Sequence, residues 1–253
     1  MARYDFRSPR LFVDVPLAAG AAVALDRDQT NYLVNVLRLA AGDGVLVFNG
    51  RDGEWRAALA HGAKGGKRDA SLAIGEQTRP QPEPPNLHLL FAPLKHARLD
   101  YVVQKAVEMG VSRLQPIMTQ HVQVTRVNAD RMRANAVEAA EQCGILALPE
   151  IGAPLRLEPV LAAHDPARLM VFCDEEAEVH DPVAALRSVS VGTAAMPLAV
   201  CIGPEGGFAE AERAALLRLP KVVRLSIGPR ILRADTAAVA ALALVQAVLG
   251  DWR

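Results

Sequence analysis

Two glycine-proline loops near the end of the chain hold the residues best suited to chemistry. The loop at residues 203–207 follows the apolar run 198–202, and the loop at 228–232 follows the run 222–227. Buried strands that end in glycine turns place backbone N–H and C=O groups at the carboxyl edge of a sheet, where open α/β folds bind their ligands. The spacing therefore predicts a ligand pocket built from both loops.

Charged side chains lie between the second loop and an Ala-rich helix predicted over 237–249. Two arginines, Arg230 and Arg233, next to a helix N-terminus can form an anion site, and Asp235 or Thr236 is placed to cap the helix. The segment 218–234 has five basic residues and no acidic one. We expect this segment to carry phosphate contacts; a solvated face of mixed charge is the alternative.

The composition excludes several classes of protein. The 28 basic and 28 acidic residues give a net charge of zero, although 174–181 alone holds five acids and neither Lys nor Arg. Three distant cysteines and six scattered histidines predict neither a disulfide framework nor a metal site. No apolar run approaches the roughly 20 residues of a membrane helix, and no signal peptide is recognisable. We therefore expect a cytoplasmic protein without a metal or a membrane partner.

A proline-rich stretch predicts a boundary between two domains, with a first domain at 1–79, a linker at 80–86 and a second domain at 87–253. Turn signals in the first domain separate short strands, interrupted by one helix at 28–39, which is typical of a small β-barrel or sandwich. These strands are predicted at 10–15, 22–25, 45–49, 54–60 and 70–76. The hairpin tip 62–69 carries Lys64, Lys67 and Arg68, which could contact a backbone phosphate or belong to a solvated loop.

The second domain alternates strands with helices, which predicts a mostly parallel sheet with helices on both faces. The predicted strands are 87–93, 111–118, 168–173, 198–202 and 222–227. The predicted helices are 98–109, 129–143, 182–189, 209–219 and 237–249. Because the last helix is apolar almost all round, we expect it to be buried on both sides, as a subunit interface would do.

Several strings together resemble one family closely. The strings IGPEGGF at 202–208 and GPRILR at 228–233, followed by an acidic-Thr-Ala helix start, are similar to the RsmE family of SPOUT-class 16S rRNA uracil-N3 methyltransferases. Further similar strings are QKAVEMGV at 104–111, EAAEQCG at 138–144, VLRL at 36–39, GD at 42–43 and FNG at 48–50. The resemblance covers nearly the whole chain.

The resemblance implies an α/β fold with a C-terminal SPOUT trefoil-knot domain and a smaller PUA-like N-terminal β-barrel that binds RNA. It also implies a homodimer, S-adenosylmethionine as cofactor, and the 16S rRNA of the small ribosomal subunit as partner. The implied cofactor-binding residues are Leu90, Gly203, Pro204, Glu205, Gly206, Gly207, Leu225, Ile227, Gly228, Ile231 and Leu232, with 90–93 and 172–174 nearby at strand ends. The residues that we predict to bind RNA are Arg38, Lys64, Lys67, Arg68, Arg126, Arg131 and Arg230.

Methylation at N3 of uracil requires removal of a proton and stabilisation of negative charge that spreads onto the flanking carbonyl oxygens. The resemblance implies that Arg233 meets the second need and that Asp235 accepts the proton or orients a base turned out of its stack. This chain has Asp235 where the family often has Glu, Gln120-His121 in place of a charged pair, and Ile145 in place of Arg. The alternatives are a knotted methyltransferase acting on another RNA such as tRNA, and an inactive RNA-binding homologue.

Overall fold

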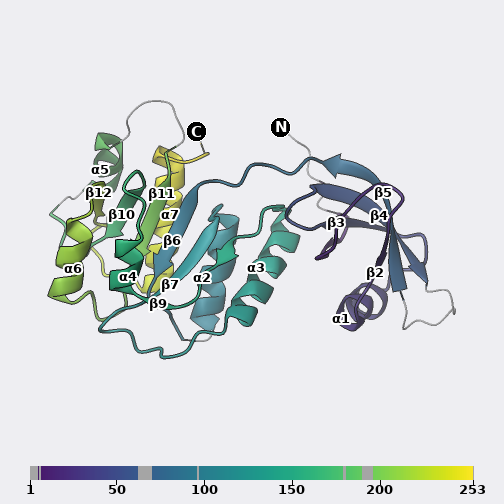
Figure 1. Ribbon diagram of the computed structural model, residues 1–253, viewed down its shortest axis with the longest axis horizontal. Helices are drawn as coiled ribbons and strands as arrows, with labels where there is room; N and C mark the ends of the chain where they lie inside the picture. The colour runs from purple at the N-terminus through teal and green to yellow at the C-terminus, as the bar shows by residue number, and fades with distance from the viewer. Residues whose placement is uncertain are drawn as a thin grey trace. The chain divides into compact units, whose positions relative to one another are not determined.

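A computed structural model describes residue 5 and residues 7–61, 70–95, 97–178, 181–189 and 196–252. The chain divides into two compact units (Figure 1). Unit 1 contains the residues up to Glu83 together with 140–148, and unit 2 contains 84–139 and the residues from Pro149 onward. The predicted linker at 80–86 spans the point where unit 1 gives way to unit 2. The return of 140–148 to unit 1 was not predicted.

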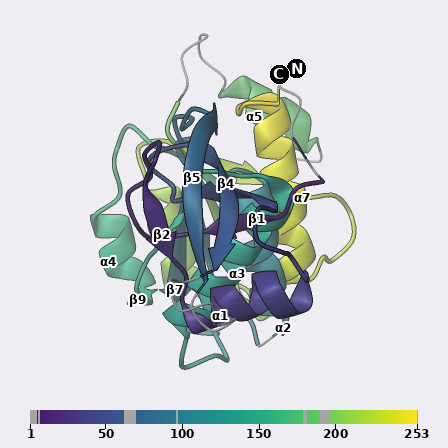
Figure 2. The ribbon, with the colours of Figure 1, turned by 90° about the vertical axis from the view of Figure 1, so that its right-hand side faces the viewer.

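Unit 1 is built on a five-stranded sheet in the order β1-β3-β4-β5-β2 (Figure 2). Strand β1 runs parallel to β3, and the other neighbours are antiparallel. The bounds are β1 Arg10–Phe12, β2 Ala22–Ala24, β3 Gly44–Phe48, β4 Glu54–His61 and β5 Ala70–Arg79. Apolar side chains from all five strands form one buried core. The loop with Lys64, Lys67 and Arg68 lies outside the described residues.

The predicted helix at 28–39 needs correction. A short α-helix, α1 (Arg27–Thr30), continues directly into a π-helix, η1 (Asn31–Val36). Asp26 and Gln29 form a capping box at its start. The wider turns keep Leu33 fully buried, and Arg38 then adopts a positive φ of 57°, which ends the helix earlier than hydrophobic spacing predicts.

A buried ion cluster holds unit 1 together. The carboxylate of Glu54 accepts hydrogen bonds from Arg10 Nε at 2.9 Å and from Arg79 Nη2 at 2.6 Å. Arg79 also donates to the carbonyl of Gly144, and the N–H of Phe12 donates to Glu141. Residues 140–148 are thereby fastened to β1 and to the end of β5.

Unit 2 is built on a sheet in which every pairing is parallel, with the order β12-β10-β11-β6-β7-β8 and β9 paired to β7. The strands are β6 Leu87–Phe91, β7 Arg113–Met118, β8 Glu150–Ile151, β9 Leu155–Arg156, β10 Leu169–Cys173, β11 Leu198–Ile202 and β12 Val222–Leu225. This order makes β10, β11 and β12 neighbours. Their carboxyl ends therefore meet at one edge of the sheet.

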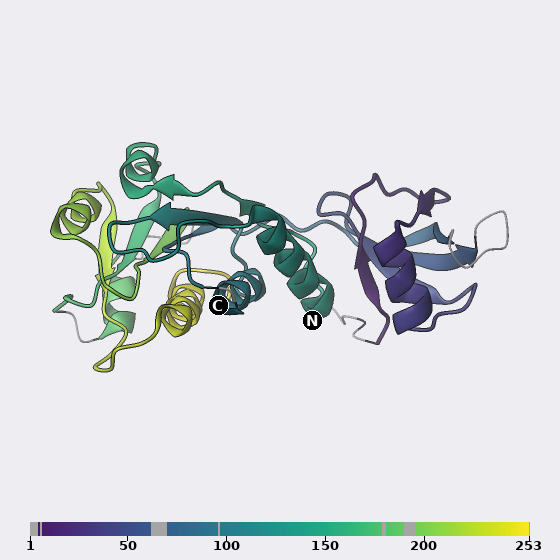
Figure 3. The ribbon, with the colours of Figure 1, turned by 90° about the horizontal axis from the view of Figure 1, so that it is seen from below.

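Helices cover both faces of this sheet, as predicted (Figure 3). Helices α2, α5 and α7 pack together on one face, and α4 and α6 pack together on the other. The helices are α2 Ala97–Glu108, α3 Ala129–Cys143, α4 Leu157–Ala162, α5 Pro182–Ser188, α6 Glu210–Leu217 and α7 Ala234–Val248. The short elements β8, β9 and α4 were not predicted, because two to six residues carry too little periodicity.

Helix α7 begins three residues earlier than predicted. Arg233 is its N-cap residue and makes no side-chain capping bond, while Asp235 lies in the first turn and accepts a hydrogen bond from the N–H of Thr236. The predicted capping role of Asp235 or Thr236 is therefore wrong. Buried residues such as Leu242 and Val245 face the unit, whereas Leu244 is only half-buried. Among the described residues no helix is long and apolar enough to cross a membrane.

Candidate active site

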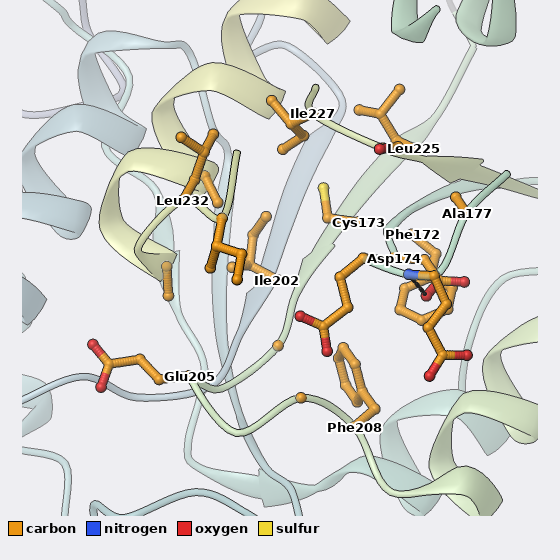
Figure 4. Close-up of a pocket in the computed structure, with 18 of the residues that line it drawn as sticks. Phe172, Cys173, Asp174, Ala177, Ile202, Glu205, Phe208, Leu225, Ile227 and Leu232 are labelled. Carbon is orange, nitrogen blue, oxygen red and sulfur yellow. Dashed lines mark hydrogen bonds between the residues drawn. The ribbon is translucent and has the colours of Figure 1, made fainter. Parts of the chain in front are cut away.

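A pocket of about 620 Å³ opens at the sheet edge where β10, β11 and β12 end (Figure 4). It is lined by 172–177, 202–205, 207–208 and 225–232, with Arg213, Ala234 and Ala237. Both glycine-proline loops contribute to it. This is the place where parallel α/β sheets bind ligands, because the loops after neighbouring strands diverge there.

One side of the pocket is apolar. Figure 4 shows Ile202, Ile227 and Leu232 on this side, with Phe208 across from them. The ring of Phe208 packs edge-on against Phe172, with centroids 5.3 Å apart. Gly203 permits this packing, because a Cβ at that position would lie 2.5 Å from the Phe208 ring.

The opposite side is acidic and is organised by Asp174, whose side chain is only 3% exposed. Arg224 Nε donates to this carboxylate at 2.7 Å and Arg213 Nη2 at 3.1 Å, and the N–H of Glu176 donates at 3.1 Å. Burial alone would raise the pKa of Asp174, but the hydrogen bonds from Arg213 and Arg224 outweigh it and hold the pKa below its ordinary value. The carboxylate therefore stays ionised and joins the loop after β10 to β12 and α6.

Three further carboxylates line the pocket beside Asp174: Glu175, Glu176 and Glu205. Glu176 pairs with Arg213 at 3.4 Å, and Glu205 pairs with Arg98. Glu175 has no ion pair within the part of the chain that the structure describes. The wall is thus suited to a ligand with positive charge.

Cys173 also lines the pocket, but its thiol is unsuited to nucleophilic attack. Burial raises the pKa of this thiol to about 12, and the nearby charge of Asp174 adds to the effect. A cysteine nucleophile must be a thiolate at working pH. Any chemistry in this pocket therefore proceeds without a covalent adduct to Cys173.

Most of the predicted cofactor-binding residues lie around this pocket. Leu90 lies on β6 and its side chain is instead buried in the core, and Gly206 lines a second pocket. Arg233 and Asp235 are not among the lining residues, although their neighbours Leu232 and Ala234 are. Sequence reasoning did not assign Glu175, Glu176, Ala177 or Arg213 to the site. The acidic run at 174–181 was the available signal.

The predicted RNA-binding residues that the structure describes belong to both units. Arg230 is exposed at the pocket, Arg126 is exposed after β7, and Arg38 is exposed in unit 1. Arg131 forms an ion pair with Asp100, with its Nε 2.8 Å from the carboxylate. Arg224, expected in the phosphate-binding segment, is held by Asp174.

Comparisons with known proteins agree on one family. Residues 81–246 match the family described as RNA methyltransferase domain, and 25–66 match the RNA methyltransferase PUA domain. Ribosomal RNA small subunit methyltransferase E of Rickettsia conorii is 30% identical over 238 residues, which cover 94% of each chain. No group of three or more His, Cys, Asp or Glu side chains that could hold a metal occurs among the described residues.

Solved structures support the same assignment. A methyltransferase of Legionella pneumophila, in complex with the bound cofactor SAM, is 26% identical, with a TM-score of 0.83 over 95% of this chain and 98% of that one. Ribosomal RNA small subunit methyltransferase E of Neisseria gonorrhoeae, bound to S-adenosyl methionine, has the same fold, with a TM-score of 0.84 at 24% identity over 98% of this chain and 100% of that one. The resemblance inferred from the sequence is confirmed: the chain belongs to the ribosomal RNA small subunit methyltransferase E family of RNA methyltransferases, which use S-adenosylmethionine.

Proposed function

We propose that the protein transfers a methyl group from S-adenosylmethionine to N3 of a uridine in the 16S rRNA of the small ribosomal subunit. The observation that carries the proposal is the pocket formed by both glycine-proline loops, which combines an apolar side with an acidic side. The family to which the chain belongs supports the choice of RNA and of cofactor.

The pocket fits S-adenosylmethionine in size and chemistry. Its volume of about 620 Å³ lies in the usual range for small-molecule sites. Ile202, Ile227 and Leu232 offer an apolar surface for the adenine, and backbone groups of both loops can bind its polar edge. Glu175 and the neighbouring carboxylates suit the ammonium and sulfonium charges. When bound, the cofactor supplies an electrophilic methyl group.

The first turn of α7 supplies the proposed chemistry. Arg233 and Asp235 lie beside Leu232 and Ala234, which line the pocket. We propose that Arg233 stabilises negative charge on the uracil carbonyl oxygens and that Asp235 accepts the N3 proton.

Mass mapping of modified uridines in small-subunit RNA tests this function. We expect RNA from a deletion strain to lack one 3-methyluridine, and we expect the purified protein to restore it in vitro with S-adenosylmethionine. An unchanged map would refute the proposal. Loss of a modified uridine from tRNA instead would assign the enzyme to a different RNA.

An Asp174→Asn variant should bind the cofactor about tenfold more weakly and lose about 2 kcal/mol of stability. The neutral amide removes the counter-charge of Arg224 and leaves Arg213 paired only with the exposed Glu176, so the loop after β10 is held less firmly to β12 and α6. Calorimetric titration and thermal unfolding measure both effects. Asp165→Asn, the same change at an exposed turn of unit 2, is the control and should alter neither quantity. If Asp174→Asn bound the cofactor as tightly as the wild type, the proposed role of Asp174 would be contradicted.

We further propose that the protein is a homodimer with a trefoil knot in unit 2. The half-buried Leu244 on α7 and the 97% exposed side chain of Ile231 leave apolar surface for a second copy to cover. The segment after β12 leads from the edge of the sheet back to α7, which packs on α2 and β11, and this return supports the knot. Its ribosomal RNA substrate would place the enzyme in the cytoplasm.

A further inference from the structure

A second pocket of about 320 Å³ lies against the far side of the 203–207 loop. It is lined by Pro93, Leu94, Lys95, Arg98, His121, Gln123, Val124, Pro204, Glu205 and Gly206. Pro204 and Glu205 line both pockets, so a single loop separates them. A molecule in this second pocket lies next to whatever occupies the first.

The wall between the two pockets is firmly held. His121 Nδ1 lies 3.1 Å from the carbonyl oxygens of both Gly206 and Gly207. Since carbonyls only accept hydrogen bonds, this contact needs a proton on Nδ1. The N–H of Gln120 donates to the buried Glu212 at 2.8 Å, which fixes the segment that carries His121. The departure from the family at Gln120-His121 therefore occurs where this chain braces the loop.

The second pocket is polar and carries a surplus of positive charge. Arg98 pairs with Glu205, so these two charges offset each other. Lys95 is exposed, and no acidic side chain among the described residues pairs with it. Gln123 adds an amide that can both donate and accept hydrogen bonds. A phosphate together with a polar heterocycle matches this combination of groups.

We infer that the second pocket holds the target nucleotide of the RNA, with its phosphate at Lys95 and its base against the shared wall of Pro204 and Glu205. The inference rests on the proposed function, because it concerns the RNA that this function requires. Unstacked nucleotides are bound by proteins in pockets of this kind, which contact both the backbone and the base edge. Nucleotide and cofactor then meet at Pro204 and Glu205, the two residues that line both pockets.

Photocrosslinking tests the position of the base directly. A fragment of small-subunit RNA with 4-thiouridine at the methylated position is irradiated with the full-length protein and S-adenosylhomocysteine. We expect the crosslinked peptides to contain residues 93–98 or 121–124. Crosslinks confined to other peptides would overturn the inference. Methylation of the unmodified fragment is measured in parallel, so failure of the proposed function is recognised separately by the absence of any methylated uridine.

A Lys95→Ala variant tests the phosphate contact. We expect RNA affinity to fall roughly threefold to tenfold and the salt dependence of binding to decrease by about one ion, with unchanged affinity for S-adenosylmethionine. Arg187→Ala, which removes an exposed positive charge from the last turn of α5 and changes neither pocket, is the matched control. Equal RNA affinities and salt dependences for the two variants would contradict the assignment.

Discussion

An Arg233→Ala variant is expected to lose about 10²- to 10³-fold in kcat and to bind S-adenosylmethionine as tightly as the wild type. When N3 of uracil attacks the methyl carbon, negative charge shared with the carbonyl oxygens must be stabilised until the bond has formed. Arg233 is the exposed N-cap residue of α7, between the pocket-lining residues Leu232 and Ala234. Its guanidinium is thus available to the substrate at the edge of the cofactor pocket.

Steady-state kinetics on small-subunit RNA and calorimetric titration of the cofactor separate the roles open to Arg233. An Arg233→Lys variant keeps the positive charge but loses the planar set of guanidinium donors. Its kcat should therefore lie between those of the wild type and Arg233→Ala. Arg187→Ala removes an exposed arginine in the last turn of α5, which lines neither pocket, and should leave kcat unchanged. A kcat for Arg233→Ala within threefold of wild type would remove Arg233 from the mechanism.

The loops of the pocket could be predicted from the sequence because their signal is local. A buried apolar run followed by a glycine-proline turn marks the end of a strand, and the ends of parallel strands share one edge. The acidic wall could not be found in this way. Asp174 acquires its role through Arg213 and Arg224, which lie 39 and 50 residues further along the chain. Because the sequence does not reveal this distant carboxylate partner, Arg224 was predicted to contact phosphate instead.

The predicted fold class is confirmed, while the boundaries of several elements differ for physical reasons. Hydrophobic spacing near residues 28–39 cannot distinguish an α-helix from the π-helical turns that bury Leu33. Asp235 looks like a cap in the sequence, but α7 gains a further turn at its start. The return of 140–148 to unit 1 depends on the contact between Glu141 and Phe12, 129 residues apart, which no local pattern encodes.

A Glu54→Gln variant should lose about 3 kcal/mol of the unfolding free energy of unit 1. The side chains of Glu54 and Arg10 are 4% and 3% exposed, and the side chain of Arg79, which also contacts Glu54, is 17% exposed. The amide keeps the size of the carboxylate but removes the negative charge that both guanidinium groups contact. Denaturant unfolding followed by Trp55 fluorescence, in a Trp252→Phe background, reports on this unit because Trp55 adjoins Glu54 on β4.

The control is Glu76→Gln, the same change in the same unit at an ion pair with Arg56, whose side chains are 77% and 50% exposed. It should cost about 0.5 kcal/mol or less, and an equal loss in the two variants would contradict the argument from burial.

Burial alone would raise the pKa of Glu54, but hydrogen bonds from Arg79 and Arg10 outweigh it and hold the pKa below its ordinary value of 4.5. As the pH falls below 4.5, Glu54 therefore becomes protonated in the unfolded chain before it does so in the folded protein. The advantage of the wild type over Glu54→Gln should accordingly be full at neutral pH and shrink in that acidic range.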